Sequence, residues 1–282
     1  MTGLTTQTAY IDEIHAWQQD MERQLRAEDG WLTVVGFEWL KAGQNTIGSS
    51  PENDTHLPPS APAHLGVLTV DADRVTLRVT AFDPVTIDGV PADPAQLYLL
   101  FDGHTDSTAP IVRMGSVSFF IIQREGQYVA RVRDNESETR RNFAGRVWFP
   151  PDPAYRTTAV FTPHAAKRTI QVENSRGRLT DMDNPGYVEF ELLGEKRRLE
   201  AFEADDGRLW FVIRDQTSGR QTYGAGRFVY SAWLDKAANQ LELDFNKAYH
   251  PPCAFTEFAM CPYPPPENRL PISLPVGEKF PG

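Results

Sequence analysis

The chain begins with the polar and apolar pattern of one amphipathic helix. From Thr6 to about Arg26, apolar side chains recur at three- and four-residue steps with charged and amide side chains between them. This spacing places the apolar groups on one helical face. Because the opposite face is acidic rather than basic, we expect the helix to pack on its own domain and not on a membrane. The apolar positions are Tyr10, Ile11, Ile14, Trp17, Met21 and Leu25.

After Gly30 the pattern changes to short runs of β-branched and aromatic residues, separated by clusters of glycine, proline, asparagine and aspartate. This texture is typical of antiparallel β structure. A first series of strands is expected at 66–70, 74–80, 84–87, 96–101, 110–114, 117–123 and 127–133. A second series is expected at 158–163, 167–173, 178–181, 186–193, 196–204, 207–214, 226–230 and 240–245. The second series is long enough to curl into a small barrel or sandwich.

The stretch 244–270 follows neither the helical nor the strand period, and we call it the clasp. It holds both cysteines, six prolines and five aromatic rings. Proline stiffens the backbone and removes donors, while the aromatic rings need cover from water. We therefore expect an ordered segment that packs against the preceding strands and forms part of any functional site.

The length of 282 residues suits one large or two ordinary domains. The turn-rich segment 134–157 is expected to bridge two β regions, either lining a cleft between them or lying on the surface as a solvated connector. We predict a mainly β protein with an N-terminal helix in 1–29, a β sandwich in 30–135 and a second antiparallel β barrel or sandwich in 136–282 that the clasp closes.

The net charge and the hydropathy of the chain argue against two classes of binding partner, nucleic acids and membranes. A net charge of −10 argues against a general nucleic-acid binder, because neutralising phosphates requires a basic face. The N-terminus lacks the pattern of a secretory signal, and no stretch approaches the roughly 20 apolar residues of a membrane span. We expect a cytoplasmic protein in which Cys253 and Cys261 are buried, inert thiols, although in an exported protein they would close a small disulfide loop.

Turn residues of the first β region follow a familiar order: Gly43 to Gly48, Asn53-Asp54 through Leu57, Ser60, His64 and Asp88-Gly89. This order resembles forkhead-associated (FHA) domains, and it implies a β sandwich of that kind. In that family an arginine and a serine bind phosphothreonine, and an asparagine precedes the later glycine. Here Ser49 replaces the arginine, Asp88 replaces the asparagine, and Ser60 is one residue farther from His64 than is usual. A carboxylate at Asp88 would repel phosphate without an arginine fork to offset it, which argues against phosphopeptide binding.

A second resemblance covers most of the chain from Gly30 onward. The signature consists of 148–150, 223–228, 244–249, 251–255, Cys261-Pro262 and 264–270. This signature is similar to that of the domain of unknown function 1684 family, whose name brings no activity with it. Members of that family commonly carry asparagine where this chain has His250.

The cysteines and the nearby histidine suggest two kinds of chemistry. His250, Cys253 and Cys261 offer soft ligands for zinc, and His250 beside Cys253 would make a base and nucleophile pair. The spacing of the cysteines suits no standard zinc site, and the asparagine of the relatives at position 250 would serve neither role. We therefore expect no metal and no cofactor.

Carboxylates at strand ends are a further possibility. Asp134, Asp215, Asp244 and Glu267 are placed where paired acids perform acid–base work or hold a divalent cation, but acidic residues also cap turns. The catalytic candidates are Asp134, Asp244, His250 and Cys253.

A set of amide, phenol and guanidinium groups offers the best binding chemistry. Such groups recognise a small polar or anionic molecule through charge-assisted hydrogen bonds, and they equally well form an internal network that satisfies backbone carbonyls. The set is Tyr223, Arg227, Asn246, Tyr249, Glu267, Asn268 and Arg269.

The leading hypothesis from the sequence is thus a protein that binds a small polar or anionic ligand between the second β domain and the clasp. The alternatives are a hydrolase that uses a carboxylate or the His/Cys groups near the clasp, and a structural or protein-interaction module. No Walker loop, GxSxG elbow or HExxH motif supports a common enzyme class.

Overall fold

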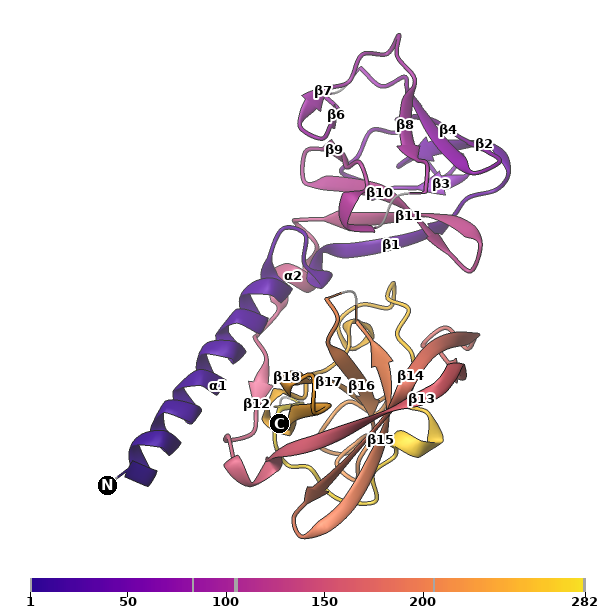
Figure 1. Cartoon of the computed structure of the whole chain (residues 1–282). Helices are drawn as coiled ribbons and strands as arrows, with labels where there is room; N and C mark the ends of the chain where they lie inside the picture. Colours follow the sequence, from indigo (N-terminus) through magenta and orange to yellow (C-terminus); the bar gives the residue numbers. More distant parts are fainter. Residues whose placement is uncertain (1, 83, 104–105, 205, 281–282) are drawn as a thin grey trace. The chain divides into compact units, whose positions relative to one another are not determined.

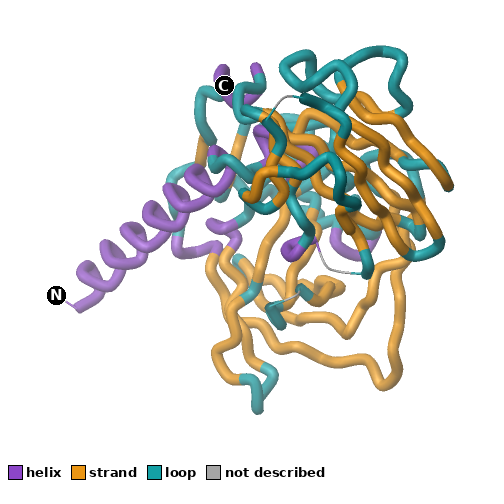
Figure 2. Tube along the Cα trace, turned by 90° about the horizontal axis from the view of Figure 1, so that it is seen from above, coloured by secondary structure: helices purple, strands orange, loops and turns teal. Residues whose placement is uncertain are grey.

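The structure is a computed structural model that describes residues 2–82, 84–103, 106–204 and 206–280. Strands are the most common regular element of the described chain (Figures 1 and 2), so the predicted mainly β fold with an N-terminal helix is confirmed. The chain forms two compact units, one of residues 25–143 and one that combines residues 1–24 with 144–282. Among the described helices, none has the length and apolar character needed to cross a membrane.

The unit of residues 25–143 is a sandwich of two sheets. One sheet has the order β1-β11-β10-β9-β6-β7 and the other the order β3-β2-β4-β5-β8. Apolar side chains from both sheets, such as Leu68, Leu77, Phe119 and Val132, share one buried core. The first sheet comprises β1 (Val34–Trp39), β6 (Thr86–Ile87), β7 (Val90–Pro91), β9 (Val112–Met114), β10 (Val117–Arg124) and β11 (Gln127–Asp134). The second comprises β2 (Gly43–Gly48), β3 (Thr55–His56), β4 (Gly66–Asp71), β5 (Arg74–Val79) and β8 (Tyr98–Phe101), and the short helix α2 (Glu138–Asn142) ends the unit.

Loop residues of this sandwich are bonded within the unit. The Ser49 hydroxyl donates to the carbonyl of Ala61 at 2.8 Å, and the Asp88 carboxylate accepts the backbone N–H of Ile111 at 2.8 Å. Asp134, one of the catalytic candidates, lies at the end of β11, where its carboxylate accepts the backbone N–H of Glu136 at 2.9 Å. Such bonds are typical of carboxylates and hydroxyls that stabilise turns.

The other unit is built on one seven-stranded antiparallel sheet with the order β17-β16-β15-β14-β13-β19-β18, which curls around its own core (Figure 1). Its strands are β13 (Arg156–Glu173), β14 (Leu179–Leu192), β15 (Glu195–Glu203), β16 (Leu209–Ile213), β17 (Arg227–Tyr230), β18 (Ala232–Asp235) and β19 (Gln240–Asp244). A separate pair joins β12 (Val147–Trp148) to β20 (Glu278–Lys279). The core includes Val188, Phe211, Leu243 and Phe245, together with Leu274 and Val276 from the end of the chain.

Two pairs of expected strands are in fact single long strands. The predicted breaks at 164–166 and 182–185 lie inside β13 and β14, which pair along their length with one register shift between Pro163 and Arg168. Pro163 has no N–H to donate to the ladder, and the Asn184 amide donates to the carbonyls of Gly186 and Ala201 near this irregularity. The predicted breaks were therefore wrong because turn-forming residues there produce a bulge rather than a turn.

The helix α1 (Thr2–Arg26) carries the predicted apolar stripe, and its residues up to Gln24 belong to the same unit as residues 144–282. Tyr10 and Ile14 are buried, and the Tyr10 hydroxyl lies 3.0 Å from both carboxylate oxygens of Asp244 in β19. Lys247 adds an ion pair with Glu13 at 2.6 Å. The helix is thus attached to the sheet by polar as well as apolar contacts.

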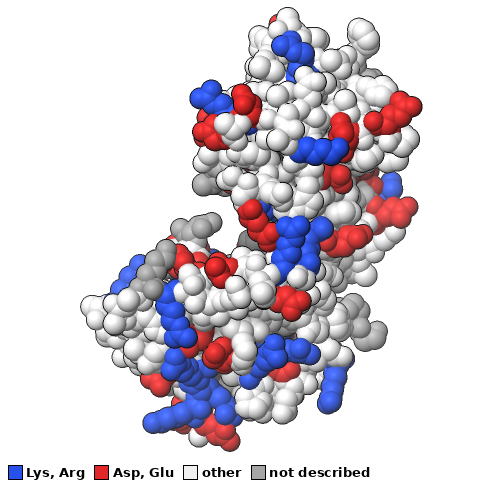
Figure 3. Space-filling model, turned by 90° about the vertical axis from the view of Figure 1, so that its right-hand side faces the viewer, with Lys and Arg blue, Asp and Glu red and all other residues white. Residues whose placement is uncertain are grey.

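On the face drawn in Figure 3, basic and acidic side chains are interspersed. The net charge of −10 is therefore not gathered into one acidic patch on this face.

Candidate functional site

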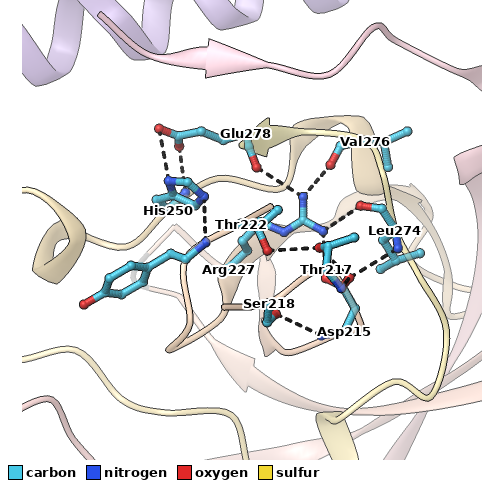
Figure 4. Close-up of polar contacts among 10 residues, drawn as sticks. Asp215, Thr217, Ser218, Thr222, Arg227, His250, Leu274, Val276 and Glu278 are labelled. Carbon is cyan, nitrogen blue, oxygen red and sulfur yellow. Dashed lines mark hydrogen bonds and ion pairs between the residues drawn. The ribbon is translucent and has the colours of Figure 1, made fainter. Parts of the chain in front are cut away.

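Arg227, the first residue of β17, is completely buried. Its guanidinium donates to the Asp215 carboxylate at 2.8 Å and to the carbonyls of Leu274 at 3.0 Å, Glu278 at 3.3 Å and Val276 (Figure 4). An arginine fork suits this task because its donors point in fixed directions. Arg227 therefore attaches the C-terminal segment 274–278 to β17.

The loop between β16 and β17 folds back on itself beside Arg227. Asp215 accepts the backbone N–H and the hydroxyl of Thr217 at 2.8 Å and 2.6 Å, and it also accepts the backbone N–H of Leu274 at 3.2 Å. The Thr217 and Thr222 hydroxyls lie 3.0 Å apart. Gly226 ends the loop with a φ of +104°, and a Cβ there would lie 2.3 Å from the Ile213 carbonyl, so only glycine fits.

His250 and Glu278 form a second buried pair next to this loop (Figure 4). The backbone N–H of Tyr223 donates to His250 Nε2 at 3.2 Å, and His250 Nδ1 lies 3.5 Å from a Glu278 carboxylate oxygen. Burial, together with the charges of Arg227 and Arg146, lowers the pKa of His250 to about 3. Both ring nitrogens of His250 therefore have partners. The neutral ring accepts the backbone N–H of Tyr223 through Nε2 and so helps to hold the loop.

Glu278 also binds two groups besides the His250 ring. Its carboxylate accepts the backbone N–H of His250 at 2.7 Å and a guanidinium N–H of Arg146 at 2.5 Å. Burial raises the pKa of Glu278 to about 7, and the Arg146 charge and the His250 N–H oppose that rise without cancelling it.

Asn268 attaches the far end of the clasp to β15. It is fully buried, its Oδ1 accepts the N–H of Glu200 at 2.8 Å, and its Nδ2 donates to the Glu200 carbonyl at 2.9 Å. The neighbouring side chains of Glu267 and Arg269 are exposed. The Asn268 side chain thus makes the two hydrogen bonds to the Glu200 backbone that an adjacent strand would otherwise make. The charged side chains on either side of Asn268 face solvent.

The first residues of the clasp lie elsewhere, against α1. The Asn246 amide donates to the Tyr10 hydroxyl at 2.8 Å and to the Asp152 carbonyl at 2.9 Å, and its oxygen accepts the Asp152 N–H at 2.8 Å. Asp244 is buried next to it and accepts the Asn246 backbone N–H at 3.0 Å. Burial raises the pKa of Asp244, and the hydrogen bonds from Asn246 and Tyr10 oppose that rise.

A pocket of about 460 Å³ opens beside Asp244, between α1 and the sheet. Its volume falls within the range of small-molecule sites, roughly 300–1,000 Å³. The lining comes from four parts of this unit: Trp17, Asp20, Met21 and Gln24 of α1; Arg208 before β16; Tyr230, Ser231 and Ala232 of β17 and β18; and Glu242, Asp244, Lys247 and Tyr249 of β19 and the clasp.

Aromatic rings form one wall of the pocket. The rings of Tyr230 and Tyr249 are within 13° of parallel with centroids 6.3 Å apart, and Trp17 meets Tyr249 edge-on at 6.3 Å. Burial raises the pKa of the Tyr249 hydroxyl, with a further contribution from its hydrogen bond to Tyr230. The Tyr249 phenol therefore remains neutral at physiological pH.

Basic groups lie over and beside this wall. The Arg208 guanidinium carbon is 4.6 Å from the centre of the Tyr230 ring, and Arg208 pairs with Asp206 at 2.7 Å while about half of its side chain stays exposed. Lys247 lines the pocket beside its ion pair with Glu13. The pocket thus offers flat apolar faces, phenolic and serine hydroxyls, and charges of both signs.

Comparison with known proteins supports the identity of this unit. A family model described as a protein of unknown function (DUF1684) matches residues 141–279. The solution NMR structure of an uncharacterised protein from Haloarcula marismortui is 34% identical to this chain, covers 50% of it and is itself covered over 79% of its length, with a TM-score of 0.42. The chain belongs to the DUF1684 family. The matched region includes Arg227, His250, Asn268 and Glu278, and the family description indicates no function.

FHA-domain structures are also similar to part of this DUF1684 protein. The FhaA FHA domain, complexed with the intracellular domain of Rv3910, is 20% identical, covers 33% of this chain and is covered over 84% of its own, with a TM-score of 0.23. A structure from a study of phosphothreonine-dependent FHA domain interactions is 18% identical, with coverages of 34% and 92% and a TM-score of 0.23. The comparison with curated proteins gave no match.

The structure separates the residues that the sequence grouped together. Arg227 and Tyr223 lie in the buried loop network, Asn268 lies at the β15 contact, and only Asp244 and Tyr249 of the predicted residues line the pocket. Trp17, Arg208 and Tyr230 are pocket residues that the sequence does not predict, because each has the pattern of an ordinary helix, turn or strand residue. Within the described ranges, no group of three histidine, cysteine, aspartate or glutamate side chains is placed to hold a metal ion.

Proposed function

We propose that this DUF1684 protein binds a small polar ligand in the pocket between α1 and the sheet, with a flat part of the ligand on the tyrosine wall and an anionic part near Arg208 and Lys247. The observation that carries the proposal is the pairing of the Tyr230 and Tyr249 rings with the two basic side chains on one pocket of suitable volume. Aromatic faces and a few polar groups are what small-molecule sites commonly combine.

The charges of the lining support a polar rather than an apolar ligand. Arg208 is half exposed and already lies over the Tyr230 ring, so its remaining donors are available to an anionic group without a change of rotamer. Lys247 lies beside Asp244 on the pocket wall and supplies a second basic group there. Ligand binding here would keep the small polar ligand of the leading hypothesis from the sequence, but at a pocket between α1 and the sheet rather than between the second β domain and the clasp.

The test is a thermal-shift screen of the full chain against a panel of small carboxylates, phosphates and heteroaromatic metabolites. A ligand that binds only the folded state raises the melting temperature by mass action. We expect Arg208→Ala to abolish the shift that a hit produces, without unfolding the protein.

Arg198→Ala is the matched control for that variant. The Arg198 side chain is equally exposed, lies 3.5 Å from the centre of the Tyr187 ring and pairs with Glu200, yet it does not line the pocket. The ligand-induced shift should therefore survive in Arg198→Ala. A shift that survives in Arg208→Ala, or a panel with no hit, would count against the proposed site.

Asp244 supports a second candidate function, hydrolysis. A buried carboxyl with a raised pKa on the wall of a pocket is a candidate general acid. Turnover of generic ester, phosphate or glycoside substrates that disappears in Asp244→Asn would favour this function, and turnover that survives the change would exclude this residue from the role.

A further inference from the structure

The two cysteines of the chain lie in contact within the clasp. Cys253 belongs to a short 3-10 helix, Pro252–Ala254, and its backbone N–H donates to the sulfur of Cys261 at 3.3 Å. A backbone nitrogen is two bonds from its own Cβ, so this contact brings the Cys261 sulfur to the base of the Cys253 side chain. The two thiols are also hydrogen-bonded to each other and are not joined by a disulfide in this structure.

Cys261 is fixed in position by the turn between β13 and β14. Its backbone N–H donates to the Ser175 hydroxyl oxygen at 3.1 Å, and its carbonyl accepts the Ser175 N–H at 2.8 Å. The Ser175 hydroxyl in turn donates to the Ala259 carbonyl at 2.9 Å. The Cys261 side chain is almost completely buried, so it reaches Cys253 more readily than it reaches solvent.

Cys253 differs from Cys261 in exposure and environment. It is only half-buried, the Cys261 side chain hydrogen-bonds to its thiol, and the Tyr223 hydroxyl donates to its backbone carbonyl at 3.0 Å. The hydrogen bond from Cys261 is the main cause that lowers the pKa of Cys253, and burial opposes it. A more accessible thiolate is the better nucleophile toward an oxidant.

We propose that Cys253 and Cys261 are a reversible oxidation site, at which hydrogen peroxide oxidises Cys253 to a sulfenic acid, and Cys261 then closes an intramolecular disulfide. In the first step the Cys253 sulfur attacks the peroxide oxygen, the O–O bond breaks, and the leaving oxygen takes the thiol proton, which gives a sulfenic acid and water. In the second step the Cys261 sulfur attacks the Cys253 sulfur, the S–O bond breaks, and hydroxide leaves with the Cys261 proton as a second water. Two thiols and one peroxide thus become one disulfide and two waters.

The geometry favours this outcome over irreversible oxidation. Sulfenic acid persists and oxidises further where no thiol can reach it, whereas here the second sulfur is already adjacent and held by Ser175. A disulfide requires Cβ atoms about 3.5–4.5 Å apart, and the sulfur of Cys261 at the base of Cys253 makes this reach small. Dithiols then restore both thiols by exchange.

The experiment treats the folded full chain with hydrogen peroxide and measures intact mass and iodoacetamide labelling. We expect the loss of the mass of two hydrogen atoms, the loss of labelling at both cysteines, and recovery of both after dithiothreitol. Peptide mapping should find the 253–261 linkage within one chain. Retention of both labelled thiols, or disulfides only between chains, would overturn the proposal.

Two variants assign the order of the steps. Cys261→Ser should leave Cys253 to accumulate as a sulfenic acid that a dimedone probe labels, whereas Cys253→Ser should leave Cys261 unlabelled at the same peroxide dose. Equal probe labelling of the two variants would refute the assigned roles. Melting temperatures of the variants establish that each is folded, and the wild-type mapping stands independently of both.

Discussion

Arg227 and Asp215 form an ion pair at 2.8 Å in which neither side chain has more than 1% of its surface exposed. The pair links the polar loop after β16 to the first residue of β17, and the same guanidinium binds three carbonyls of the C-terminal segment. Breaking such a pair leaves a buried charge without compensation, which costs about 3–5 kcal/mol.

The first prediction concerns that pair. Arg227→Met should lower the free energy of unfolding by about 3–5 kcal/mol, measured by urea denaturation, because Asp215 and the C-terminal carbonyls lose their donor. Arg220→Ala, an exposed arginine in the same loop, is the control and should stay within about 0.5 kcal/mol of wild type. Equal midpoints for the two variants would show that the buried pair is not needed for stability.

The second prediction concerns the pH dependence that Glu278 produces. Its pKa in the folded protein is about 7 against an ordinary value of 4.5, so the folded state holds a proton that the unfolded state releases between these values. The stabilising contribution is complete below pH 4.5 and is lost as the pH rises to about 7. The unfolding free energy of wild type minus that of Glu278→Gln should fall by at most about 1.4 kcal/mol per pH unit across this window.

His250 should produce the opposite slope. Its pKa is lowered from 6.5 to about 3, so below pH 6.5 the unfolded state takes up a proton that the folded state refuses. Stability relative to His250→Asn should therefore fall as the pH is lowered from 6.5 toward 3. An asparagine amide does not titrate between pH 3 and 6.5, so the comparison isolates the contribution of the histidine. Parallel stability curves for wild type and His250→Asn would mean that His250 titrates normally in the folded protein.

The fourth prediction concerns the anchor of the clasp. Asn268→Ala leaves the buried N–H and carbonyl of Glu200 without partners, and each orphaned group costs about 1–3 kcal/mol. Arg269→Ala removes an exposed neighbour and should change stability by no more than about 0.5 kcal/mol. Calorimetric melting of the two variants makes the comparison, and a similar melting temperature for both would contradict the anchoring role.

The local patterns of the sequence determined much of the fold. The apolar steps between Tyr10 and Leu25 predicted α1, and alternation within strands such as 74–80 predicted β5, because helical and extended periods are properties of neighbouring residues. Breaks within β13 and β14 were predicted wrongly, since turn-forming residues near Pro163 and Asn184 also suit a bulge, and pairing with another strand decides between the two.

The candidate site was decided by tertiary structure. The composition of the clasp predicted that it would be ordered, and both of its asparagines are indeed bonded, but Asn268 faces β15 whereas Asn246 faces Tyr10 more than two hundred residues away. Trp17, Arg208, Tyr230 and Tyr249 meet at one pocket only because the sheet curls and α1 packs on it. Residues from four separate segments share no local pattern that could be read from the sequence. The sequence by itself therefore determined which segments are ordered. The tertiary structure alone determined which side chains meet.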